Sequence, residues 1–241
     1  MPRIHGSKAA YQLKTTRFSS HSLILKMAGA GDGRRAIDLG CGEGFIGASL
    51  REQGWTVDGV EIDPSAAEIA SAVLNRVLVA DVGSVPPEGL KEYDLAIFGD
   101  ILEHTPDPGA TLRGWLDSGG SPSRVIISVP NIAHMHVRTS LLLGRFQYQD
   151  RGILDKTHLH FFTRKSFLEM LEACGLEVLQ FEVSPAPVEL AFPRYANFFG
   201  NGPLHRAHAG LARRLPGLFA YQFVVMAAPI SATSNSASSC A

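Results

Sequence analysis

The sequence predicts an α/β fold built on a mostly parallel β-sheet. Short apolar runs rich in β-branched residues alternate with segments of helical length, which is the pattern of repeated βαβ units. A glycine-rich turn, GCGEG at residues 40–44, follows the first of these runs and opens a helical segment. With 241 residues, of which 45% are hydrophobic, the chain is long enough to bury one sizeable core.

The expected elements follow in the order of such units. A strand over 35–39 leads into the glycine turn, and the helix over 44–53 ends at Gly54. The strand over 56–61 is followed by a helix over 63–72, which begins at an Asp-Pro pair. The remaining predictions are strands at 76–80, 93–98, 124–129, 177–183 and 221–228, and a helix at 165–173. One domain over residues 1–230 accounts for all of them.

Two long segments interrupt this alternation. Residues 130–163 and 184–217 contain His and Arg and lack a regular hydrophobic period. Loops of this length in a compact domain are usually functional, so we expect both insertions to cover the substrate. The last residues, 231–241, are small and polar and are expected to form a disordered tail.

Charge and cysteine usage restrict the class of protein. The formal net charge of -1 argues against nucleic acid as the main partner, because phosphate contacts need clustered Lys and Arg. Cys41, Cys174 and Cys240 show no CxxC spacing, so reduced thiols in a cytoplasmic protein are expected. The first residues lack the apolar core of a signal peptide, and no apolar run reaches the roughly 18 residues that span a bilayer. The oligomeric state is left open.

The turn after the first expected strand carries residues that could bind a cofactor. Gly40, Gly42 and Gly44 allow a sharp turn and a close approach of the backbone to a ligand. Glu61 ends the second expected strand, where a carboxylate can accept both hydroxyls of a ribose. A dinucleotide site would need GxGxxG, and Phe45 occupies the third glycine position of that pattern. The sequence also lacks a recognisable Tyr-Lys pair for hydride transfer, so an oxidoreductase is disfavoured.

Four landmarks resemble those of class I S-adenosylmethionine (SAM) dependent methyltransferases. They are AIDLGCGEG, VDGVEIDPSAAEIA, LVADV and YDLAIFGDILEH. The resemblance implies SAM as the cofactor and a Rossmann-like, doubly wound, seven-stranded sheet, mostly parallel, with an antiparallel last strand at 221–228. The residues it implies for SAM binding are Asp38, Gly40, Gly42 and Gly44 at the methionine part, Glu61 at the ribose and Asp81 at the adenine.

A second polar cluster follows the fourth expected strand. SAM carries an activated methyl group, so the protein must align an acceptor atom and manage a proton. Ligands of open α/β sheets bind outside the carboxyl ends of the strands, which is where Asp100 lies. A helical turn would put Asp100 and Glu103 on one face. His104 and His158 are the candidate general bases.

Three roles are open for this cluster. Asp100, Glu103, His104 and His158 could together ligate a divalent ion. The run from Asp100 to His104, DILEH, resembles the ExxEH motif of metal-dependent ubiquinone-pathway and small-RNA 2′-O-methyltransferases. It differs in that the side chain of Asp100 is one methylene shorter than that of the corresponding Glu. A general-base role needs no metal, and a structural role would have Glu103 brace the helix. Of the two functional roles we favour the base, and no metal ligand is predicted. His160 and Asn131 are interpreted as structural.

Other segments bear on the methyl acceptor. The run from LLLGRFQYQD to LEACGLEV, together with SVPN and LPGLFAYQFVV, resembles bacterial methyltransferases of surface-polysaccharide and glycan pathways. The resemblance implies O-methylation of a hydroxyl on a glycan or small metabolite. The alternatives are N-methylation of an amino sugar and a non-catalytic SAM-binding partner of a glycosyltransferase.

The basic segment 189–219 has three possible roles. It holds Arg194, Arg206, Arg213 and Arg214 with interleaved aromatics. It could be a lid over an anionic or lipid-linked sugar, or an interfacial helix in weak contact with a membrane surface. The third possibility is a solvated helix packed on the sheet through Leu211, Leu215 and Leu218.

Overall fold

The computed structural model describes residues 18–84, 93–117, 122–186 and 203–230. The strands are β1 Arg35–Leu39, β2 Thr56–Glu61, β3 Arg76–Val79, β4 Leu95–Gly99, β5 Arg124–Pro130, β6 Leu176–Pro185 and β7 Ala220–Pro229. The helices are α1 Ser20–Ala28, α2 Phe45–Glu52, α3 Pro64–Ser71, η2 Leu102–His104, α4 Pro108–Asp117, α5 Met135–Leu142, α6 Arg164–Ala173, α9 Pro203–Arg214 and α10 Pro216–Phe219.

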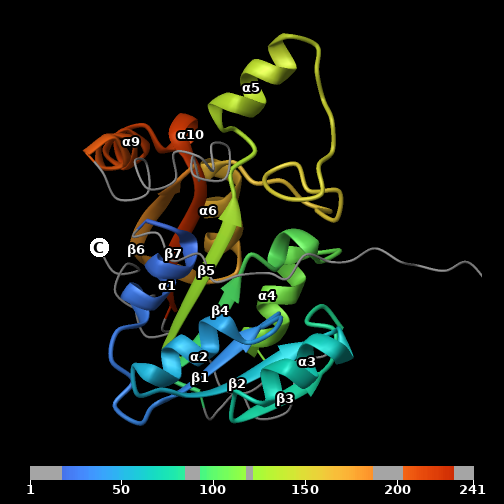
Figure 1. The fold of residues 1–241 in the computed structure, drawn as a ribbon, viewed down its shortest axis with the longest axis vertical. Coiled ribbons are helices and arrows are strands. Elements are labelled where there is room, and N and C mark those ends of the chain that lie inside the picture. The colour runs from blue at the N-terminus through green and yellow to red at the C-terminus, as the bar shows by residue number, and fades with distance from the viewer. Residues whose placement is uncertain (1–17, 85–92, 118–121, 187–202, 231–241) are drawn as a thin grey trace, which may run out of the picture.

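The strands form one sheet in the order β3-β2-β1-β4-β5-β7-β6 (Figure 1). The pairs from β3 to β5 are parallel, whereas β7 runs antiparallel to both β5 and β6. The predicted seven-stranded, doubly wound sheet with an antiparallel last strand is therefore confirmed. The strand order reverses between β1 and β4, and in such sheets the ligand crevice opens at that switch point.

Both faces of the sheet are buried. Neighbouring residues of a strand point to opposite faces, so Ile97 packs on the side of α1, α2 and α3, while Phe98 packs on the side of α4 and α6. Leu23 of α1 and Trp115 of α4 belong to these two cores. Burial on both faces explains why the central strands read as continuous apolar runs.

Two helices of the core, α1 and α4, add to the predicted set. The segment of α4, PGATLRGWLD, contains two glycines and gives only a weak helical pattern. It is held by tertiary contacts instead: Leu112 and Trp115 are buried, and Trp115 Nε1 donates to the carbonyl of Val82 at 2.9 Å.

Both insertions contain helices. The first includes α5, which buries only Val137 and so leaves no apolar period in the sequence. The second includes α9, whose packing differs from the prediction. Leu211 and Leu215 are exposed, while Ala209 and Ala212 are buried, because small side chains let the helix lie close to β6.

The structure bears on the expectations about membrane spans and cysteines for the described residues alone. Among the described residues, no helix is long and apolar enough to cross a membrane. Cys41 and Cys174 are free thiols, whereas Cys240 and the predicted tail 231–241 lie outside the described residues.

Candidate functional site

The glycine turn between β1 and α2 has a left-handed backbone. The φ angles are 76° at Gly40, 54° at Gly42 and 83° at Gly44. A Cβ on Gly40 would lie 2.7 Å from the side chain of Ile101, so the turn can approach the segment after β4 only as glycine. A Cβ on Gly42 would meet nothing within 4 Å, so the backbone there faces open space that a ligand can enter.

Asp38 on β1 is a buried carboxyl beside this turn, with a relative exposure of 2%. Burial raises its pKa to about 7, repulsion from Glu61 adds to the shift, and the backbone N–H of Gly47 acts in the opposite direction. Its Oδ2 atom has no hydrogen-bond partner among the described residues. A cationic amino group placed here would both pair with the carboxylate and lower its pKa.

Glu61 at the end of β2 holds the turn from the other side. Its Oε2 accepts from the backbone N–H of Gly42 at 2.8 Å, and its Oε1 accepts from that of Asp63 at 2.9 Å. A carboxylate offers about four acceptor positions, so both oxygens can still accept a ligand hydroxyl. Asp81 follows β3, and its two oxygens accept from the N–H of Gly83 and the hydroxyl of Ser84. All the predicted cofactor residues thus lie at one edge of the sheet, and their role in binding stays a prediction.

Asp100 is not placed as the helical-turn argument expected. It precedes the 3₁₀ helix η2 and has a φ of 54°, so it does not share a helical face with Glu103. Its Oδ1 accepts from Ser128 Oγ at 2.6 Å, and its Oδ2 accepts from Gln222 Nε2 at 2.6 Å. Asp100 therefore links β4 to β5 and β7. A polar residue inside an otherwise apolar strand, as at Ser128 and Gln222, is the sequence signal for such a partner.

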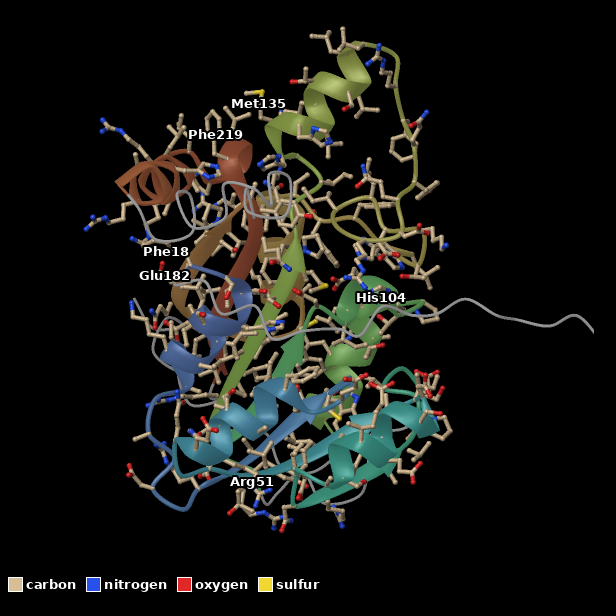
Figure 2. The ribbon with its side chains drawn as sticks, viewed as in Figure 1. Phe18, Arg51, His104, Met135, Glu182 and Phe219 are labelled. Carbon is tan, nitrogen blue, oxygen red and sulfur yellow. The ribbon has the colours of Figure 1, made fainter. Side chains whose placement is uncertain are left out.

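His104 and His158 lie side by side, although they are far apart in the sequence. Their ring centroids are 4.8 Å apart in an edge-to-face arrangement. The backbone of η2 brings them together, since the carbonyl of Glu103 accepts from the N–H groups of Leu159 and His160 at 2.8 and 3.0 Å. The first insertion is thereby fastened to the carboxyl end of β4. Figure 2 labels His104 in η2, beyond the end of β4.

One ring nitrogen of each histidine is hydrogen-bonded to a backbone carbonyl. Nδ1 of His104 lies 3.2 Å from the carbonyl of Thr157, and Nδ1 of His158 lies 3.1 Å from that of Ile153. A carbonyl can only accept, so Nδ1 carries the proton in each ring, and Nε2 has a free lone pair when the ring is neutral. Burial, and next the neighbouring His104, lower the pKa of His158, which keeps it neutral near pH 7.

A third group joins this pair. Glu103 is buried, with 1% exposure, and ligand atoms of Glu103, His104 and His158 all lie within 4.8 Å of one another. Two imidazole nitrogens and a carboxylate form a donor set suited to a borderline divalent ion. Asp100, the fourth residue of the candidate metal set, is engaged by Ser128 and Gln222 instead.

His160 and Asn131 have the structural surroundings expected of them. Nε2 of His160 lies 2.8 Å from the carbonyl of Pro106, which ties the insertion to the loop before α4. Asn131 is fully buried, and its Nδ2 donates to the carbonyl of Ala220 at 2.8 Å. It joins the end of β5 to the start of β7.

Arg213 is tied to the body of the domain. Its Nη2 lies 3.3 Å from Glu182 Oε2 on β6, and its guanidinium stands over the ring of Phe18. Both partners are labelled in Figure 2. This pairing makes Arg213 a packing residue of α9, whereas Arg194 lies outside the described residues.

Comparison with known families decides the class of this site. A family model described as a methyltransferase domain matches residues 10–181, which is well over half of the chain. The chain belongs to the methyltransferase domain family. The family and the fold imply S-adenosylmethionine as the cofactor. The buried carboxyl of Asp38 suits the cationic amino group of its methionine part, and the open space at Gly42 leaves room for it.

Relatives of this methyltransferase-family chain include ubiquinone biosynthesis O-methyltransferases. That of Bordetella avium is 30% identical over 96 residues, which cover 37% of this chain and 40% of the relative. That of Aeromonas salmonicida is 27% identical over 157 residues, covering 61% of this chain and 64% of the relative. The chain therefore matches less than two thirds of the length of these relatives.

Solved structures share the fold at low identity. A SAM-dependent methyltransferase from Archaeoglobus fulgidus has a TM-score of 0.57 and 18% identity, covering 87% of this chain and 92% of that one. A [4+2]-cyclase has a TM-score of 0.53, also at 18% identity, covering 83% of this chain and 76% of that one. Proteins named for different activities thus share this fold, so the fold alone does not determine the reaction.

Proposed function

We propose that this methyltransferase-family chain transfers a methyl group from SAM to a hydroxyl oxygen of a glycan or related small metabolite. The observation that carries the proposal is that two features lie at the carboxyl ends of the neighbouring parallel strands β1 and β4. One is the glycine turn with its buried acid, Asp38, and the other is the pair of histidines beside η2. The curated relatives named above are O-methyltransferases, which supports oxygen as the acceptor atom.

The cofactor would be held by residues of three strand ends. Asp38 would pair with the amino group of the methionine part, since its carboxyl is buried and its Oδ2 is not satisfied by the described residues. Glu61 would accept the ribose hydroxyls with the acceptor positions left beside Gly42 and Asp63. Asp81 would lie by the adenine. Bound SAM supplies the activated methyl group.

The proton of the acceptor hydroxyl would pass to Nε2 of His158 or His104. His158 is the favoured base, because its lowered pKa keeps the lone pair of Nε2 available at neutral pH. The backbone carbonyl of Ile153 fixes the tautomer and would stabilise the imidazolium that forms.

A panel of acceptors tests this function. The full chain, incubated with SAM and either hydroxyl sugars or the matched amino sugars, should give methyl ethers that mass spectrometry and NMR can locate. Methylation of nitrogen alone would instead support the amino-sugar alternative. Tight binding of SAM with no product from any acceptor would favour a non-catalytic partner of a glycosyltransferase.

A metal-assisted reaction is the second candidate, and the cluster of Glu103, His104 and His158 is the observation in its favour. A metal ion would hold the acceptor oxygen and lower the pKa of its hydroxyl. If the histidines act as bases alone, turnover should be unchanged in EDTA, and Mg²⁺ or Mn²⁺ should add nothing. Loss of turnover in EDTA that either ion restores would establish the metal mechanism. Metal at stoichiometry in dialysed wild-type protein, but not in a Glu103→Gln variant, would do the same.

A further inference from the structure

The segment after β5 carries a group of exposed apolar side chains. We call residues 135–148, which include α5 and the chain that follows it, the apolar arm. Leu142 is 86% exposed, Leu143 63% and Tyr148 57%, and every residue from 141 to 150 is exposed. In Figure 1, α5 projects from the end of the sheet, and Figure 2 shows Met135 at its start, far from Arg51.

The apolar arm is held at its base only. Val137 is the buried residue of α5, and it packs against Ile153 and Leu154 in a small cluster of its own. His134 caps the helix, with its Nδ1 accepting from the N–H of His136 at 3.2 Å. The base therefore fixes the direction of the helix, while its far end and the following chain face solvent.

The charge of this segment has one sign. Residues 135–148 contain Arg138 and Arg145 and no Asp or Glu. Nε of Arg138 donates to the carbonyl of Ala133 at 2.6 Å, which places this cation at the base of the helix. Exposed leucines and aromatic rings accompanied by arginines suit a surface with an apolar interior and an anionic outer layer.

We propose that the apolar arm docks this protein on an anionic lipid surface. Leu141, Leu142 and Leu143 are consecutive at the end of a helix, so their side chains point roughly 100° apart. A flat protein face could cover only part of such a tip, whereas fluid lipid can surround it. Phe146 and Tyr148, packed edge to face at 5.3 Å, add aromatic rings of the kind that lie at lipid–water interfaces. The inference does not depend on methyl transfer.

Vesicle flotation of the full chain tests this proposal. The protein should bind vesicles of phosphatidylcholine with about one third phosphatidylglycerol, and bind vesicles of phosphatidylcholine alone much more weakly. Leu142→Asp should weaken binding about tenfold or more, because it puts a charge where an apolar side chain enters the lipid. Arg145→Glu should weaken it at least about fivefold, and added salt should mimic that change.

A matched control is Ile69→Asp on α3, since Ile69 is 52% exposed on a different part of the surface. It should bind vesicles as the wild type does. The proposal fails if the wild type does not bind anionic vesicles, or if Leu142→Asp binds like Ile69→Asp. A concentration-dependent dimer that Leu142→Asp disrupts, without vesicle binding, would show that the apolar arm pairs with a second copy instead.

Discussion

Replacing His158 with alanine is expected to lower turnover by about 10²–10⁴-fold, the range for loss of a positioned acid–base group. SAM affinity should stay nearly unchanged, because Asp38, Glu61 and Asp81 lie on other elements of the fold. Calorimetry measures the affinity for SAM, and single-turnover assays measure the rate at which the acceptor is methylated, so the two effects can be separated. The wild type should also lose turnover as the pH falls through the lowered pKa of His158, since only the neutral ring accepts a proton.

His160→Ala is the matched control for this variant. His160 comes from the same insertion and also bonds to a backbone carbonyl, that of Pro106. Its loss should change stability slightly and leave turnover within a few-fold of wild type. If His158→Ala turns over normally, His104 becomes the candidate base. If it loses the fold, as judged by its melting temperature, the histidine is structural, because its bond to the carbonyl of Ile153 holds the insertion together.

Replacing Asp38 with asparagine is expected to weaken SAM binding about 10–150-fold. A hydrogen bond to a charged group is worth about 1.5–3 kcal/mol, and every 1.4 kcal/mol is about tenfold in affinity. For the wild type, SAM should bind more weakly at about pH 6 than at about pH 8, because the carboxyl must ionise and its pKa is raised to about 7. The variant should lose this pH dependence. Calorimetry at both pH values measures it.

The same variant should be more stable than wild type without cofactor above pH 7. The folded pKa of Asp38, about 7, lies above the ordinary value of 3.8, so folding favours the protonated form. Its contribution to stability is present below pH 3.8 and is lost as the pH rises to about 7. Asparagine has no charge to bury, so the gain should be about 2–4 kcal/mol, at about 1.4 kcal/mol per pKa unit. Equal melting temperatures and equal SAM affinity would contradict the role of Asp38.

Local sequence determined the part of this domain that carries the predicted cofactor residues. The strands β1 and β2 lie where the apolar runs predicted them, because strands buried on both faces leave continuous β-branched segments. The turn at Gly40–Gly44 could be read because left-handed backbone is open to glycine and costly for other residues. Asp63-Pro64 marked the start of α3 for a similar local reason, since Asp63 caps the helix and proline opens it.

The arrangement of the candidate catalytic residues was decided by tertiary contacts. Asp100 is one side chain in the sequence, but Ser128 and Gln222, on two other strands, fix where its carboxylate points. The carbonyl of Glu103, bonded to Leu159 and His160, brings His158 to His104. Such contacts join residues far apart in the chain and leave no period or spacing in the sequence. The helix α5 was not predicted, because it buries a single valine. A helix was considered in the segment of α9, but its packing was not predicted, because it buries alanines that fit only against β6.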